Sequence, residues 1–215
     1  VKMFTADILP QLTRRGYKDL VLEIFPRGKA DSLIGNEISA FNRSGRIGKG
    51  MLRFLEVTDK DNFIRLLKQA NRHGVKIHAG GVNYESVYET LWYPNFSSHP
   101  KRFQRVKEEI ANNSGEAIRS LAASGKKVFS LNGCVHNDLY PTGKNTSASF
   151  GLKLNRHFPQ RMVEIDLVIP ELSERNRYFE DLPLSYRCIW RSFIPRSGVN
   201  LVSEKGPNSY LLYWQ

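Results

Sequence analysis

The chain has 215 residues, of which 40% are hydrophobic and 25% charged, a composition typical of a globular protein with a substantial core. This length predicts one domain over residues 1–215. No apolar run approaches the roughly 20 residues of a membrane helix, so we expect no transmembrane segment. The net charge of +11 favours anionic partners, but Lys and Arg are scattered. This scatter favours a generally basic, solvated surface over a dedicated nucleic-acid site.

Helical and strand signals alternate along the chain, which predicts an α/β fold with a mainly parallel sheet flanked by helices. Thr5 is expected to open a first helix that runs to Arg15. Residues 19–25 (DLVLEIF) are typical of a buried strand. Residues 27–50 contain five glycines, which predict a flexible Gly-rich loop with at most a short helix near 37–42.

An amphipathic helix is predicted over 58–73, because Phe63, Leu66, Leu67 and Ala70 share one face. Helices are also predicted over 84–93, from Pro100 to Ser124 with a break near 112–115, and over 147–157. Strands are predicted at 75–79, at 126–131 and at 161–169, where Glu164 and Asp166 are expected on a solvated face. The C-terminal runs 187–194, 199–203 and 209–214 are expected to be β-rich, with antiparallel edge strands.

The most informative stretch runs from Lys126 to Pro141. A buried strand there breaks at Gly133, and His136, Asn137, Asp138 and Tyr140 follow in a loop. Chemistry in an open α/β sheet gathers at the carboxyl ends of the strands. An imidazole at such a place can bind a metal or transfer protons near neutral pH.

Three strand ends therefore predict a polar pocket, with Glu23 near the end of the first strand, His78 near the end of the second and His136 beyond the third. Glu23 is either a functional group, as a metal ligand or general base, or a structural carboxylate held by donors. His136 is either functional or a satisfied loop histidine, and His78 either binds substrate or is structural. No HExxH, Walker A, GxGxxG or GxSxG motif is present.

Four segments, FTADILPQLTRRGYKDLVLEIFP, GVKIHAGG, VFSLNGCVHNDLYP and RMVEIDLVIPE, together resemble the haem-uptake/Tiki superfamily. This superfamily includes ChaN-like haem-binding lipoproteins, Tiki metalloproteases, TraB-type proteins and, more distantly, erythromycin esterase-like enzymes. The resemblance spans residues 4–171. It matches Glu23 to the family's strand-end carboxylate, and Gly133 with His136 to its second Gly-x-x-His element. The first Gly-x-x-His element would lie before the helix that opens at Thr5, where the sequence has no room for it. The element is either upstream of Val1 or absent, and its absence would leave the metal site incomplete.

The family includes both hydrolases and haem binders, so the resemblance does not choose between them. The favoured hypothesis is a hydrolase that cleaves a peptide or ester bond, with Glu23, His136 and a histidine supplied upstream holding a divalent metal or activating water directly. Catalysis would then involve Glu23, His136 and Asp138, while Asn137, Tyr140 and His78 would contact a peptide or small-molecule substrate. The alternatives are haem binding for iron uptake, with the aromatic side chains of 84–93 over the macrocycle, and a binding domain without catalysis. The family also suggests an exported protein of the bacterial cell envelope.

Overall fold

The computed structural model describes residues 2–28, 33–56, 60–83, 86, 100–168, 199–203 and 206–214. The chain divides into two compact units, residues 1–157 and 158–215, and each is described by itself. None of the described helices has the length and apolar character needed to cross a membrane. Two predicted elements, the helix over 84–93 and the run 187–194, fall outside the described residues apart from residue 86.

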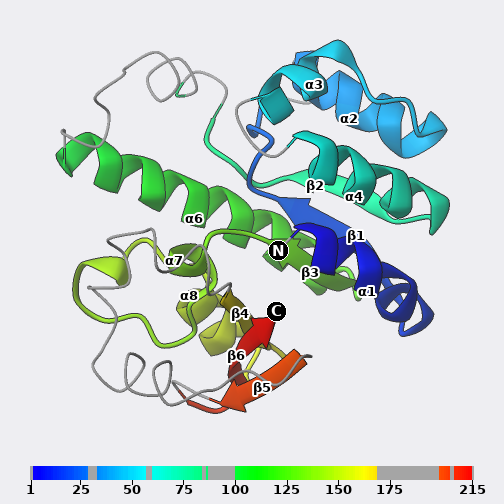
Figure 1. Ribbon diagram of the computed structural model, residues 1–215. Coiled ribbons are helices and arrows are strands. Elements are labelled where there is room, and N and C mark those ends of the chain that lie inside the picture. Colours follow the sequence, from blue (N-terminus) through cyan, green and yellow to red (C-terminus); the bar gives the residue numbers. More distant parts are fainter. Residues whose placement is uncertain are drawn as a thin grey trace. The chain divides into compact units, whose positions relative to one another are not determined.

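The first unit is a mixed α/β structure, which confirms the predicted fold class at this level. Its three strands form a small parallel sheet in the order β2-β1-β3, with helices on both faces (Figure 1). The elements are α1 (Lys2–Arg14), β1 (Tyr17–Leu22), α2 (Leu33–Ser44), α3 (Lys49–Glu56), α4 (Lys60–Arg72), β2 (Lys76–Ala79), α6 (Pro100–Ala123), β3 (Lys127–Leu131), α7 (Cys134–Asn137), a 3₁₀ turn (Gly143–Asn145) and α8 (Gly151–His157).

The two faces of this sheet differ in chemistry. One face carries Leu20, Leu22 and Ile77, all fully buried in the main core with side chains of α1 to α4. Because side chains alternate along a strand, Asp19 and Val21 lie on the opposite face. That second face is covered by α6, which contacts all three strands. The first face holds the unit together, and the second positions polar groups.

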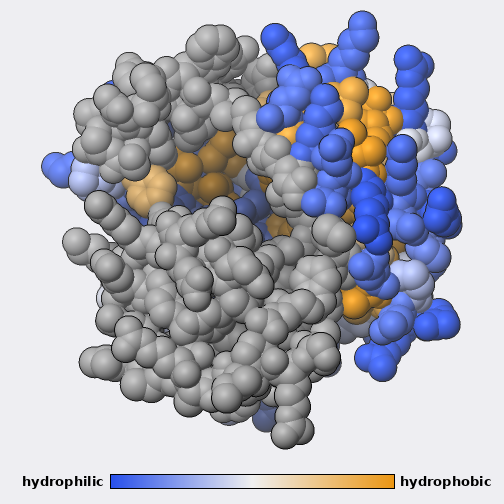
Figure 2. Space-filling model, in the orientation of Figure 1, coloured by the Kyte–Doolittle hydropathy of each residue, from blue (hydrophilic) through white to orange (hydrophobic). Residues whose placement is uncertain are grey.

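The predicted amphipathic helix is present as α4, and all four residues predicted for its buried face are buried. Helix α1 begins at Lys2 rather than Thr5 and continues through Pro10 to Arg14. Gly16, with a φ of +89°, follows its end. In the face of the molecule shown in Figure 2, most described side chains at the right are hydrophilic, with apolar residues between them.

Much of the segment predicted as a loop over 27–50 is helical. Helix α2 is longer than the short helix expected near 37–42, because Ile34, Ile38 and Phe41 form a buried stripe at helical spacing. Glu37 of α2 binds the start of α3, where its carboxylate accepts hydrogen bonds from the backbone N–H of Gly50 at 3.0 Å and of Met51 at 2.7 Å. The N–H groups at the start of a helix can bind phosphate, but here Glu37 already occupies those of Gly50 and Met51. The flexibility of 27–50 stays a prediction.

Helix α6 is continuous where a break was predicted near 112–115. Asn113 and Ser114 are buried, and their side chains bind carbonyl groups that follow β2. Asn113 Nδ2 donates to Gly81 O at 2.8 Å, and Ser114 Oγ donates to Gly80 O at 2.7 Å. Polar residues that favour turns in isolation are therefore satisfied here by tertiary contacts, and the helix continues.

The helix predicted over 147–157 begins only at Gly151. A side chain at this position could not be accommodated, because a Cβ atom there would lie 2.1 Å from Asn137 O. This glycine thus allows the start of α8 to pack directly against the end of α7. The loop predicted after Gly133 is the single helical turn α7.

The second unit contains a three-stranded sheet in the order β4-β6-β5, built from β4 (Glu164–Val168), β5 (Val199–Ser203) and β6 (Ser209–Trp214). Strand β6 pairs with β4 in parallel and with β5 antiparallel. The prediction that Glu164 faces solvent is wrong. Glu164 is 2% exposed and accepts a hydrogen bond from Ser209 Oγ at 2.7 Å, whereas its neighbour Ile165 is 50% exposed.

Candidate functional site

The carboxyl edge of the first sheet brings Glu23 and Asn132 together. Strands β1 and β3 are parallel, and Leu22 pairs with Leu131. The next residues along each strand are Glu23 and Asn132, and the pairing continues because Glu23 N donates to Leu131 O at 3.4 Å. Val21 lies on the α6-covered face and pairs with Ser130. Glu23 and Asn132 each lie two positions beyond this pair, so they occupy neighbouring positions on the same face.

Glu23 is fixed by the turn that follows β3. Its Oε2 atom accepts a hydrogen bond from Gly133 N at 2.8 Å. Burial raises the pKa of Glu23 to about 6, although the hydrogen bond from Gly133 acts in the opposite direction. The carboxyl group therefore changes its ionisation close to neutral pH. That is the range in which a general base is most effective.

His136 is buried, with 7% of its surface exposed, and its ring is held in one orientation. The Nδ1 atom lies 3.0 Å from Ala148 O. A carbonyl can only accept, so Nδ1 carries the proton and Nε2 has the lone pair in the neutral ring. Burial lowers the pKa of His136, the Ala148 hydrogen bond raises it, and the charge of Lys107 lowers it further. His136 is thus a neutral base at pH 7.

Gly133 leaves a space that Glu23 and His136 both border. A Cβ atom placed on Gly133 would lie 3.5 Å from Glu23 Oε1 and 3.6 Å from His136 Cδ2. Both side chains therefore lie within van der Waals range of one point. The backbone of Gly133 has φ −63° and ψ 147°, a conformation open to any residue. Glycine is consequently not required here for its backbone conformation, and a methyl group at this position would occupy the space that glycine leaves open.

Asn132 is a polar residue of this edge that the sequence did not single out. Ser114 Oγ of α6 lies 2.9 Å from Asn132 Oδ1, whereas Asn132 Nδ2 is buried without a hydrogen-bond partner in the described part of the chain. A buried donor without a partner costs about 1–3 kcal/mol. The sequence did contain a pattern that predicts the burial of Ser114. This residue lies three positions after Ala111 and four before Ile118, on the buried stripe of α6.

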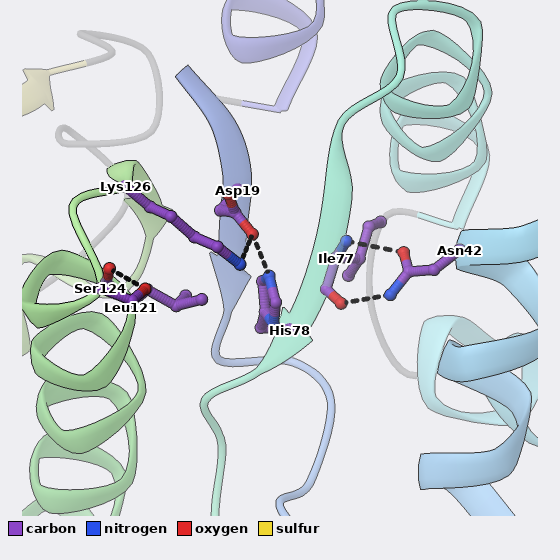
Figure 3. Close-up of polar contacts among 7 residues, drawn as sticks. All are labelled: Asp19, Asn42, Ile77, His78, Leu121, Ser124 and Lys126. Carbon is purple, nitrogen blue, oxygen red and sulfur yellow. Dashed lines mark hydrogen bonds and ion pairs between the residues drawn. The ribbon is translucent and has the colours of Figure 1, made fainter. Parts of the chain in front are cut away.

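His78 belongs to a different cluster on the same sheet (Figure 3). Its Nε2 atom lies 2.8 Å from Asp19 Oδ1, and Lys126 Nζ lies 3.4 Å from the same oxygen. The side chain of Asp19 is only 6% exposed, so these two neighbours compensate a buried carboxylate. The structure thus gives His78 a structural partner. Its predicted contact with substrate stays a prediction.

The polar residues after His136 have contacts within their own loop. Asp138 Oδ1 accepts a hydrogen bond from Tyr140 N at 2.8 Å, and the Asp138 carbonyl accepts one from Ser149 Oγ. This bond to the amide two residues on is typical of an Asx turn, which shapes the loop. Asn137 ends α7 where α8 packs on it. Neither the catalytic role predicted for Asp138 nor the substrate contacts of Asn137 and Tyr140 are tested by these bonds.

The donor atoms of this edge match a divalent metal only in part. Glu23 supplies a carboxylate oxygen and His136 an imidazole nitrogen, both suitable ligands. Catalytic zinc sites use three protein ligands, however, and the described residues contain no group of three or more His, Cys, Asp or Glu that could hold an ion. These side chains alone do not complete a metal site, and the predicted divalent ion stays a prediction.

The fold and site thus define an α/β protein with a carboxylate, an imidazole and an amide at the carboxyl edge of a parallel sheet. The chain was compared with models of known families, with curated proteins and with solved structures, and none of them matches. The resemblance to the haem-uptake/Tiki superfamily therefore rests on the sequence segments quoted above.

Proposed function

We propose that this protein is a hydrolase that cleaves a peptide or ester bond by acid–base chemistry at Glu23 and His136. The observation that carries the proposal is the common space beside Gly133, which both side chains border. A strand-end carboxylate with a pKa of about 6 and a neutral buried imidazole are the groups that such chemistry needs.

In the proposed mechanism, one water molecule occupies the space beside Gly133. It donates one hydrogen bond to Glu23 Oε1 and the other to the lone pair of His136 Nε2, which orients its oxygen toward the substrate. Glu23 takes a proton as the water oxygen attacks the carbonyl carbon. The same proton then passes from Glu23 to the leaving nitrogen or oxygen as the scissile bond breaks, so the carboxylate is regenerated.

Asn132 is the neighbour of Glu23 at this edge, and its side-chain amide contacts Ser114 Oγ at 2.9 Å. Its Nδ2 atom is buried and has no hydrogen-bond partner among the described residues, so we assign it no contact with substrate. The proposed hydrolysis needs no group beyond the side chains of this edge and water.

Replacing Gly133 by Ala is the sharpest test. The new methyl group would meet its neighbours at ordinary contact distances of 3.5 to 3.6 Å, and the backbone conformation suits alanine. The fold should therefore tolerate the change, while the methyl group occupies the proposed place of the water. We expect hydrolysis of a p-nitrophenyl ester and of a peptide library to fall at least about 10²-fold, like the loss of a general base.

Glu23→Gln should lose activity to the same degree, and Glu56→Gln provides the matched control. Glu56 is an exposed carboxylate of α3 that pairs with Lys60 at 3.4 Å. Activity that survives in both Gly133→Ala and Glu23→Gln would contradict the proposal, provided that thermal unfolding shows both variants folded. Metal analysis of the purified protein tests the divalent ion separately, because a stoichiometric ion lost in His136→Ala would add metal to the mechanism.

Haem binding and a binding domain without catalysis remain the alternatives. Wild-type protein without turnover on any ester or peptide would favour one of them. The aromatic run 84–93, expected to cover a macrocycle, lies outside the described residues apart from residue 86.

A further inference from the structure

A cavity of about 230 Å³ lies between α6 and α8, within the first unit. Its floor is formed by three apolar residues, Ala111 of α6 with Phe150 and Leu154, each of which is no more than 3% exposed. Gly115 allows α6 to lie close to Phe150, the residue that precedes α8, since a Cβ atom on Gly115 would lie 2.8 Å from Phe150 Cβ. The volume equals that of about eight water molecules in the liquid.

The rim of this cavity is basic. Arg119 from α6 and Lys153 and His157 from α8 are exposed residues that line it. Arg119 lies one helical turn after Gly115, and His157 lies one turn after Lys153. Residues one turn apart share a face of the helix, so each helix directs its basic residues to the same side as the cavity lining.

The other polar residues of the lining do not cancel this positive charge. Glu116 is the one acidic residue among them, and its Oε2 atom pairs with Arg27 Nη1 at 2.7 Å. Asn112 Oδ1 accepts a hydrogen bond from Lys153 Nζ at 3.0 Å, which places the ammonium group at the rim. An apolar floor below a positive rim is complementary to a small molecule with one apolar end and one anionic end.

We propose that this cavity binds a small amphipathic carboxylate, with its apolar or aromatic body on the floor and its carboxylate paired with Arg119 and Lys153. The site is formed by other residues than Glu23 and His136, and the inference does not depend on the proposed hydrolysis. Arginine is suited to the carboxylate because its planar guanidinium can donate two parallel hydrogen bonds. The net charge of +11 further favours the approach of an anion.

The test compares phenylacetate with phenylacetamide, which have the same size but differ in charge, by saturation-transfer NMR and calorimetry at low salt. Phenylacetate should bind the full chain at millimolar concentrations and at least threefold more tightly than the amide, by roughly the strength of an exposed ion pair. Arg119→Gln should weaken phenylacetate binding about two- to fivefold and leave phenylacetamide unchanged.

Arg105→Gln is the matched control, because it removes the same charge from an exposed position of the same helix, about 21 Å away along the axis. Asn112→Trp should abolish binding of both compounds by filling the cavity from its exposed rim, with thermal unfolding as the check on folding. Equal affinity for acid and amide, equal losses in the Arg119 and Arg105 variants, or no binding of phenylacetate would each overturn the proposal. Binding that persists unchanged in Gly133→Ala separates it from the hydrolytic site.

Discussion

Replacing Glu23 by Gln should stabilise the protein at neutral pH while it removes activity. Burial raises the pKa of Glu23 from 4.5 to about 6. A raised pKa means that the folded protein binds the proton more tightly than the unfolded chain does. The contribution of Glu23 to the free energy of unfolding is therefore fully present below pH 4.5, and it is lost as the pH rises through about 6. At 1.36 kcal/mol per pKa unit, the loss is at most about 2 kcal/mol.

The assay is urea unfolding of wild type and Glu23→Gln at a series of pH values between 4 and 7.5. The difference in unfolding free energy between the two proteins isolates Glu23, because other titrating groups such as His136 are common to both. That difference should shift toward the variant by up to about 2 kcal/mol as the pH rises. A pH-independent difference, or a shift toward the wild type, would refute the argument that burial controls this carboxylate.

The remaining predictions concern the pH dependence of activity, two structural side chains and the haem alternative. If Glu23 is the general base, kcat/KM should rise with pH through about 6, and a flat profile would argue against that role. Asn42→Ala should lower the unfolding free energy by about 1–3 kcal/mol, because the Asn42 amide binds both N and O of Ile77 at 2.8 Å (Figure 3); an unchanged urea midpoint would contradict this. Glu37→Ala should cost about 0.5–2 kcal/mol through loss of the α3 cap, whereas Glu37→Gln, which keeps one acceptor, should cost less. Titration with haemin should leave its Soret band unshifted, and a shift abolished in His136→Ala would instead favour the haem alternative.

Periodic apolar patterns predicted the elements that face the core. Helix α4, with Phe63 and Leu66 on its buried side, followed directly from spacing and composition. The first strand was also predicted from its composition, but it ends at Leu22 and not at Phe25. The same logic failed for α2, because five glycines between 27 and 50 outweighed the stripe formed by Ile34 and Ile38. Local composition was the weaker signal there, since tertiary packing stabilises a helix more than intrinsic propensity does.

Sequence reasoning identified Glu23 because it lies near the end of a predicted strand and His136 because it follows one, but it could not supply their partners. The amide of Gly133 binds Glu23 across 110 positions of the chain, and Ala148 orients His136 from a loop with no distinctive motif. Such bonds depend on strand register, which local patterns do not encode. The same limit hid Asp19, whose partner His78 is 59 positions away.

The two faces of the sheet have different roles, and this difference explains why the polar groups are tolerated. Leu20 and Leu22 of β1 secure the core on one face, while Asp19 and Glu23, at odd positions of the same segment, face α6. An uncompensated carboxylate within a sheet is strongly unfavourable, and the two cases are resolved differently. Asp19 lies between a lysine and a histidine, and these two neighbours compensate its burial. Among the described residues, the amide of Gly133 is the group that opposes the burial of Glu23, and the charge stays unfavourable enough to raise the pKa of Glu23. Under the proposed hydrolysis, this remaining cost is what makes Glu23 available for proton transfer.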